Sequence, residues 1–286
     1  MFYSYTVTLI TYVLALILAI AACNFVAITN QWLIILFGHV VGTLVVFIAS
    51  RIFKNSSLYD PFWSVAPVPI VIYLVFSPES QQFDIEKIIL IVLPIFFWAF
   101  RLTLNWLRDW EGLQDEDFRY KNLKQKPFSV LIDLFGIHIY PTLQVNLSLL
   151  PIYFALSVST DTANIYLYLA SLFTIGAVIL ETISDEQMRA FRKREINKGK
   201  TMKEGLWTYS RHPNYLGEIV LWLGVSIMAV SSLSGPQYIT LISPVFTYVL
   251  LVYISGVRIL EANGKEKWGH LETYQEYLKK TPALIF

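Results

Sequence analysis

"VTLITYVLALILAIAACNFVAI", residues 7–28, contains no charged side chain. A helix rises about 1.5 Å per residue, so a run of about 20 apolar residues crosses the hydrocarbon core of a bilayer. No basic residue precedes the run, whereas a cleaved signal peptide normally starts with a positive segment. The stretch therefore predicts a first transmembrane helix that the protein retains.

The composition of the whole chain agrees with a membrane protein. Of its 286 residues, 55% are hydrophobic and only 15% are charged, and the mean hydropathy is +0.53. The net charge of +1 argues against bulk attraction to nucleic acid, and Cys23, the single cysteine, cannot form an internal disulfide. We therefore expect an all-α protein, a polytopic bundle of transmembrane helices.

Apolar windows predict eight membrane spans, near residues 5–27, 32–50, 62–76, 87–107, 142–159, 164–183, 215–233 and 238–257. The intervening loops alternate between short ones and the long, basic ones near 51–61, 108–140, 184–214 and 258–286. Basic loops stay in the cytosol, so both termini are predicted to be cytosolic. We divide the chain into two N-terminal helices, residues 1–50, and a membrane domain, residues 51–286. The apolar end of the 108–140 loop is expected to lie in the membrane interface.

The stretch "GLWTYSRHPNYLGEIVLW", residues 205–222, places polar groups where the seventh span begins. Pro at the first helical turn is favourable, and the free amides of the helix start, with Arg211 and His212, predict an anion site. Asn214 and Glu218 follow on one helical face. An acidic side chain inside a membrane is costly without a partner or a function, so Glu218 is the strongest functional candidate. The alternative is a structural carboxylate held by Arg or Asn.

The sixth span carries polar side chains along one face, and this face continues beyond the membrane at the end of the helix. Glu181, Asp185, Arg189 and Arg192 share one helical face, and further Lys and Arg residues follow. This pattern predicts neutralisation of a polyanion such as a pyrophosphate. The alternative is an ordinary basic helix end in contact with anionic lipid.

The fourth span contains Arg101, Asn105 and Arg108 on one face. Arg101 lies too deep to reach water easily, so it is expected to pair with Glu181, Asp185 or Glu218. Tyr59 and Asp60 precede the third span, where interfacial anchoring is the simpler interpretation. His39, in the middle of the second span, is more typical of helix packing than of ligand binding.

Several classes of site lack their motifs. There is no His/Cys cluster at metal-ligand spacing, and no G-x-G-x-x-G, P-loop or G-x-S-x-G motif. We therefore expect no metal site, no soluble nucleotide-binding fold and no serine hydrolase.

The 205–222 stretch resembles the C-terminal signature of the steroid 5-alpha-reductase family, in particular its DUF1295 branch. "ETISDEQMRAFR", "RLTLNWLRDWEGLQDEDFRY" and "YQEYLKKTPALIF" are also similar to segments of that family. The resemblance runs from about Asp60 to Phe286 and is weakest in the first two helices. It implies an NADPH-dependent reductase in the endoplasmic reticulum of a eukaryote or the inner membrane of a bacterium.

The resemblance also implies which residues hold the cofactor. Asp185, Arg192, Tyr209, Asn214 and Glu218 match positions that contact it in steroid 5-alpha-reductases. Glu181 stands where those enzymes have Asn, Arg211–His212–Pro213 replaces another tripeptide, and their Gln-Glu pair for the substrate ketone has no clear counterpart. The full cofactor set expected here is Arg108, Glu181, Asp185, Arg189, Arg192, Tyr209, Arg211, His212, Asn214 and Glu218.

The expected reaction is reduction, with NADPH, of the C=C bond in a lipid-soluble enone. The protein must stabilise enolate charge through a hydrogen-bond donor, and the candidates for catalysis are Tyr59, Asp60, Tyr209 and Glu218. The R-H-P-N-Y-x-G core is also similar to sterol C14 and C24 reductases and to isoprenylcysteine and phospholipid methyltransferases, which use S-adenosylmethionine. A methyltransferase and a non-enzymatic membrane protein therefore stay open. The expected partners are a lipid-soluble small molecule and membrane lipids.

Overall fold

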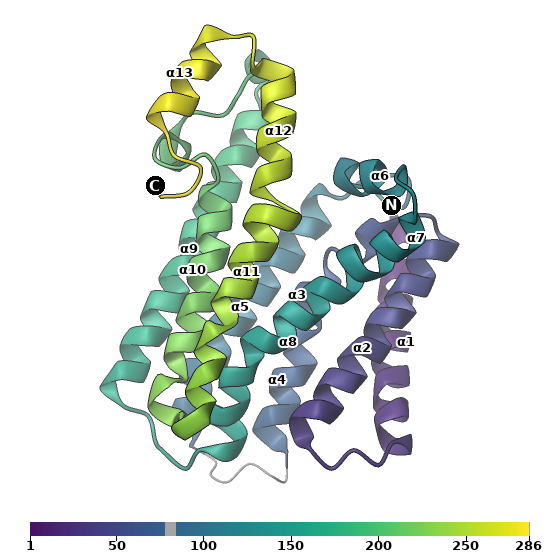
Figure 1. Cartoon of the computed structure of the whole chain (residues 1–286), viewed down its shortest axis with the longest axis vertical. Helices are drawn as coiled ribbons and strands as arrows, with labels where there is room; N and C mark the ends of the chain where they lie inside the picture. The colour runs from purple at the N-terminus through teal and green to yellow at the C-terminus, as the bar shows by residue number, and fades with distance from the viewer. Residues whose placement is uncertain (78–83, 286) are drawn as a thin grey trace.

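The backbone of every span is helical because a bilayer core offers peptide groups no hydrogen-bonding partner. The computed structural model describes residues 1–77 and 84–285, and within these ranges the chain forms helices and no strands (Figure 1). The all-α prediction is confirmed. The loop predicted near 77–86 lies largely outside the described residues.

Eight helical segments of the described chain are long and apolar enough to cross a membrane, as predicted. The first two spans are α1 (Phe2–Phe25) and α2 (Gln31–Ile52). The third combines η1 (Ser56–Leu58), α3 (Phe62–Val65) and α4 (Pro67–Phe76), and the fourth is α5 (Ile85–Asp109). The fifth span combines α7 (Ser129–Leu131), η2 (Ile132–Ile139), α8 (Tyr140–Tyr153) and η3 (Phe154–Val158), and the sixth is α9 (Ile165–Lys193). The seventh combines α10 (Pro213–Met228) and η6 (Val230–Ser232). The eighth combines η7 (Gly235–Ile242), α11 (Ser243–Val249), η8 (Leu250–Ile254) and α12 (Val257–Trp268).

Four shorter helices lie outside these spans. They are α6 (Phe118–Lys124), η4 (Glu195–Asn197), η5 (Gly205–Thr208) and α13 (Glu272–Lys280). Gly205, with φ of 60°, makes the left-handed turn that leads into η5. The seventh span begins at Pro213 with His212 at the N-cap, where the missing N–H of proline costs nothing.

The fifth span differs from its prediction. Its helix starts at Ser129, so the apolar stretch before Tyr140 is continuous with the helix of this span. The location of this stretch in the membrane interface stays a prediction. Pro141 does not end the helix, because the preceding π-helical turn η2 pairs the Tyr140 N–H with the Phe135 carbonyl and shifts the hydrogen-bonding pattern before the proline. The sequence analysis placed the start of this span near residue 142.

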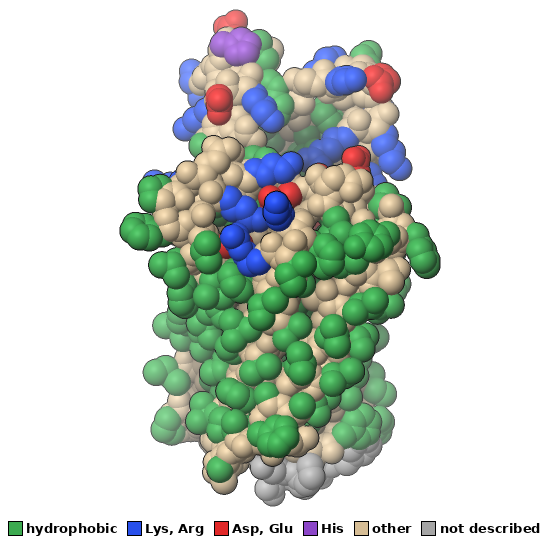
Figure 2. Space-filling view, turned by 90° about the vertical axis from the view of Figure 1, so that its right-hand side faces the viewer, with side chains coloured by type: hydrophobic (Ala, Val, Ile, Leu, Met, Phe, Trp, Pro, Cys, Tyr) green, Lys and Arg blue, Asp and Glu red, His purple; other side chains and the backbone are tan. Residues whose placement is uncertain are grey.

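The outer surface is that of an integral, multi-pass membrane protein. Large apolar side chains such as Leu9, Ile89 and Leu172 are exposed around the bundle, where lipid covers them. Figure 2 shows hydrophobic side chains over the middle and lower part of one face, with Lys and Arg gathered above them. Both termini lie in the upper half of the molecule in Figure 1, as an even number of spans requires. Their cytosolic location stays a prediction.

The helices α9 and α10 pack closely because two glycines of α10 face α9. A Cβ added to Gly217 would lie 2.8 Å from the Glu181 Cβ, and one added to Gly224 would lie 3.1 Å from the Thr174 Cα. Small residues permit such contact in membranes, where van der Waals packing drives association. This contact sets the separation of the two helices that carry Glu181, Asp185, Asn214 and Glu218.

Gly217→Ala is therefore expected to push α9 and α10 apart and to lower stability by about 1–3 kcal/mol. Thermal unfolding of the purified protein in detergent measures the effect. Gly176→Ala is the matched control in α9, since nothing lies within 4 Å of its added Cβ. An equal loss of stability in both variants would contradict the close-contact explanation.

Candidate functional site

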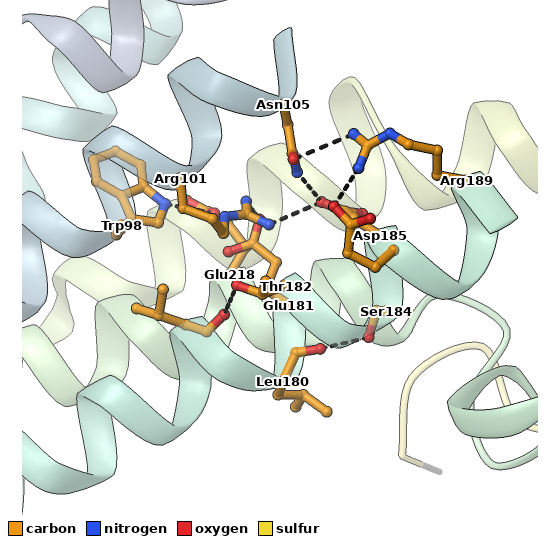
Figure 3. Close-up of polar contacts among 12 residues, drawn as sticks. Trp98, Arg101, Asn105, Leu180, Glu181, Thr182, Ser184, Asp185, Arg189 and Glu218 are labelled. Atoms are coloured by element: carbon orange, nitrogen blue, oxygen red, sulfur yellow. Dashed lines mark hydrogen bonds and ion pairs between the residues drawn. The ribbon is translucent and has the colours of Figure 1, made fainter. Parts of the chain in front are cut away.

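A buried network of charged side chains joins α5, α9 and α10 (Figure 3). Arg101 of α5 forms an ion pair with Glu181 and donates a second hydrogen bond, of 2.8 Å, to Asp185. Asn105, one turn further along α5, also donates to Asp185, at 2.9 Å. The Arg101 side chain is only 4% exposed. The predicted pairing of Arg101 with carboxylates of the sixth span is confirmed.

Arg189 continues this network toward the upper end of the bundle. Its guanidinium donates to Asp109 at 2.8 Å and to the Asn105 side chain at 3.2 Å, and it also pairs with Glu186. Arg108 forms an outer pair with Glu186 at 2.6 Å. The i, i+4 spacing on α5 and α9 thus brings two polar faces together, as the sequence predicted.

Glu218 is held by two tryptophans. Its carboxylate accepts one hydrogen bond from the indole N–H of Trp98 and one from that of Trp222, each at 2.8 Å. The Glu218 carboxyl also lies beside that of Glu181, and Glu218 is 2% exposed. The sequence analysis named Arg or Asn as holders in its structural alternative and missed Trp98, although Trp98 lies three residues before Arg101 on the same face of α5.

Three polar atoms in this network have no hydrogen-bonding partner. They are Glu181 Oε2, Asn214 Oδ1 and Arg101 Nε, all buried. Asn214 lies beside Asp185, so the free amide oxygen is at the edge of the ion-pair cluster. Buried polar atoms are nearly always hydrogen-bonded, so these atoms indicate unused binding capacity.

A second cluster surrounds Asp60. The Tyr120 hydroxyl donates to Asp60 Oδ1 at 2.6 Å, while Arg119 pairs with Asp117 at 2.8 Å and donates to the Ser255 carbonyl at 2.8 Å. Burial raises the pKa of Asp117, but the Arg119 guanidinium outweighs this and holds the pKa below its ordinary value. These residues form the D-x-R-Y element, which the sequence analysis noted only as part of the resemblance.

Tyr215 connects the two clusters. Its hydroxyl lies beside Arg119 and within electrostatic reach of Asp185. Its ring stacks on that of His212, with centroids 5.9 Å apart and an interplanar angle of 18°. The structure thus gathers Asp60, Asp185, Asn214, Glu181 and Glu218, predicted from distant segments, into one region.

Arg211 and His212 are engaged within the protein. Arg211 donates to both carboxylate oxygens of Glu261, at 2.9 and 3.0 Å, and His212 Nε2 lies 2.8 Å from Glu261 Oε1. Their backbone N–H groups donate to the carbonyls of Pro282 and Ala283. The two side chains therefore fasten the start of α10 to α12 and to the C-terminal segment, and Glu261 had no local sequence signal.

Of the remaining candidates, Tyr209 and Arg192 lie toward the surface, whereas Tyr59 is next to Asp60 in the chain. Tyr209 is 78% exposed and Arg192 is exposed at the end of α9. Tyr59 is buried, and its hydroxyl is 2.7 Å from the Thr142 hydroxyl. Thr142 donates to the His138 carbonyl, so Tyr59 is the donor in this pair. Among residues 1–77 and 84–285, no group of three or more His, Cys, Asp or Glu side chains is placed to hold a metal ion.

Comparisons with known proteins give the family. The model of the family described as "Protein of unknown function (DUF1295)" matches residues 46–281, so the chain belongs to this family. An uncharacterized protein of Schizosaccharomyces pombe is 25% identical over 270 residues, which cover 83% of this chain and 77% of the yeast protein. No solved structure matches the chain at a significant level.

Arg101→Met is expected to destabilise the protein by about 3 kcal/mol, because it leaves two buried carboxylates without their cation. Arg108→Met is the control, since its side chain is 42% exposed and such pairs contribute about 0–1 kcal/mol. Thermal unfolding in detergent compares them. Adding Glu181→Gln to Arg101→Met should restore part of the loss, and no restoration would contradict the charge argument.

Proposed function

We propose that this DUF1295 protein is a membrane reductase that uses NADPH to saturate the C=C bond of a lipid-soluble enone. One observation carries the proposal. The buried network has an unpartnered acceptor, on Asn214, at a position that the resemblance to steroid 5-alpha-reductases places at the cofactor. A purely structural network would be expected to satisfy its own hydrogen bonds.

The donor set of this region fits a dinucleotide. Asn214 Oδ1 is a buried acceptor without a partner, which suits a ribose hydroxyl or the amide N–H of a carboxamide. Arg192 is exposed where α9 leaves the bundle and is available to phosphates. Arg211 and His212 would act indirectly, by fixing the start of α10 through Glu261.

NADPH, when bound, supplies the hydride that goes to the β-carbon of the enone, and a proton completes the saturated carbonyl product. The protein has to donate a hydrogen bond to the carbonyl oxygen as negative charge develops there. We assign this role to the Asp60–Tyr120 pair. Tyr209 is exposed, whereas Asp60 and Tyr120 lie beside Arg119, whose positive charge favours an enolate. The Tyr120 hydroxyl donates to Asp60 in the structure, so in this role it would turn from Asp60 to the carbonyl oxygen.

The cofactor is tested by titrating the detergent-purified protein with NADPH and with S-adenosylmethionine, followed by tryptophan fluorescence and thermal stability. NADPH should bind, and Arg192→Ala should weaken it about tenfold, as expected for the loss of one charge-assisted contact. Glu218→Gln should weaken it indirectly, because it disturbs the carboxyl group of Glu181 beside it. Lys193→Ala, an exposed neighbour, is the control for Arg192. Unchanged NADPH binding in both variants would overturn the placement, and binding of S-adenosylmethionine alone would favour a methyltransferase.

The donor is tested by Tyr120→Phe. Loss of one preorganised donor should lower kcat for enone reduction about 100-fold and leave KM for NADPH nearly unchanged. NADPH oxidation with a panel of lipid-soluble enones, cholestenone among them, measures both constants. Tyr209→Phe is the matched control and should retain activity. Full activity in Tyr120→Phe would remove the Asp60–Tyr120 pair from the reaction.

A further inference from the structure

Glu218 is a buried carboxyl of the charged network that lacks a cation of its own. Arg101 pairs with Glu181 and Asp185, and in the described part of the chain no Lys, Arg or His forms an ion pair with Glu218. Glu218 is 2% exposed, so water does not solvate it either. An ionised carboxyl inside a membrane bundle is costly unless an opposite charge compensates it.

The neighbouring carboxyl, that of Glu181, lacks a donor. Its Oε1 accepts from Arg101, but its Oε2 is buried and receives no hydrogen bond from an N–H or hydroxyl group. Trp98 and Arg101, three residues apart on α5, donate to Glu218 and to Glu181 respectively. Gly217 brings the backbone of α10 against Glu181. These contacts place the two carboxyl groups side by side (Figure 3).

A single proton on Glu218 removes both deficits. A protonated carboxyl is neutral, has one O–H donor and keeps acceptor capacity. The O–H can donate to Glu181 Oε2, while the Glu218 oxygens still accept the indole N–H groups of Trp98 and Trp222. Glu181 is the less suitable carrier of the proton, because Arg101 already compensates its charge.

The helices around the pair supply no further positive charge. Arg101 of α5 and Asp185 of α9 are the charged groups that face the two carboxyls. The helices α8 and α11 also pack against α10, and neither contains Asp, Glu, Lys, Arg or His. With Glu218 ionised, three buried carboxylates would share one guanidinium.

We propose that Glu218 is a neutral carboxylic acid in the folded protein and donates its proton in a hydrogen bond to Glu181 Oε2. Glu218 is then a positioning residue, which holds the Glu181 carboxylate in place for Arg101 and joins α10 to α9 where the two helices are closest. The inference concerns the protein without a ligand, so it does not rest on the proposed reductase activity. Asn214 Oδ1 stays the acceptor that the network leaves for a ligand.

Infrared spectroscopy detects this proton, because the C=O stretch of a protonated carboxyl is separate from the bands of a carboxylate. The ligand-free protein in nanodiscs should show the stretch at neutral pH, and Glu218→Gln should remove it. Glu181→Gln should keep the band and move it to higher frequency, since an amide accepts more weakly than a carboxylate. Glu186→Gln, which changes a carboxyl of α9 that is 45% exposed, is the matched control and should leave the band unchanged.

The pH dependence of unfolding gives a second readout. In the unfolded chain a Glu carboxyl is ionised at neutral pH, so unfolding releases the proton of Glu218. The folded state then binds one proton more than the unfolded state, and stability falls as the pH rises. From neutral pH upward, the unfolding equilibrium constant in mixed micelles should rise about tenfold more per pH unit in the unaltered protein than in Glu218→Gln. Glu186→Gln should behave like the unaltered protein.

Absence of a protonated-carboxyl band from the unaltered protein at neutral pH would overturn the proposal. This measurement needs no variant, so a failure of Glu218→Gln to fold does not affect it. A band that is lost in Glu181→Gln and kept in Glu218→Gln would overturn the assignment of the proton to Glu218. Equal pH dependence of unfolding in Glu218→Gln and the unaltered protein would also contradict it. Failure of NADPH to bind would count against the reductase proposal alone, since both measurements use the ligand-free protein.

Discussion

The rest of the structure depends on Arg101, a cation buried among carboxylates inside a membrane bundle. A charge at this depth is costly, and its attraction to Glu181 and Asp185 offsets the cost only if the three side chains are held close together. That requirement fixes the rotation of α5 relative to α9. Asn105 and Arg189 then extend the contact along the same two faces.

The third helix of the network, α10, packs against α9 through small residues and not through charges. Gly217 and Gly224 allow α10 to approach α9 so closely that the Glu218 carboxyl lies beside that of Glu181. Trp98 and Trp222 hold Glu218 by their indole N–H groups. The composition of the segment at the start of α10 suggested an anion site, but in the structure Arg211 and His212 bind within the protein. Arg211 and His212 join α10 to α12 through Glu261, and this joint positions Tyr215 between the two polar clusters.

The two faces of α5 give the molecule two environments for ligands. One face carries charges and unpartnered acceptors, which suit a polar cofactor that enters from water. The other face lines a largely apolar cavity. A membrane enzyme that acts on a lipid-soluble compound needs both kinds of surface, because its reactants arrive from different phases.

The sequence by itself determined the helical class and the number of spans, because length, hydropathy and the 3.6-residue period act locally. It limited the partners of Arg101 to three carboxylates, of which the structure selects Glu181 and Asp185. It also identified Glu181, Asp185, Asn214 and Glu218, since carboxylates and amides are conspicuous in apolar runs. Only the tertiary structure decided that Trp98 holds Glu218, that Glu261 engages Arg211 and His212, and that Tyr120 meets Asp60. These contacts join segments far apart in the chain, and no local pattern encodes the packing that brings them together. The continuation of the fifth helix through Pro141 was missed for a related reason, since a π-helical turn depends on the surrounding packing.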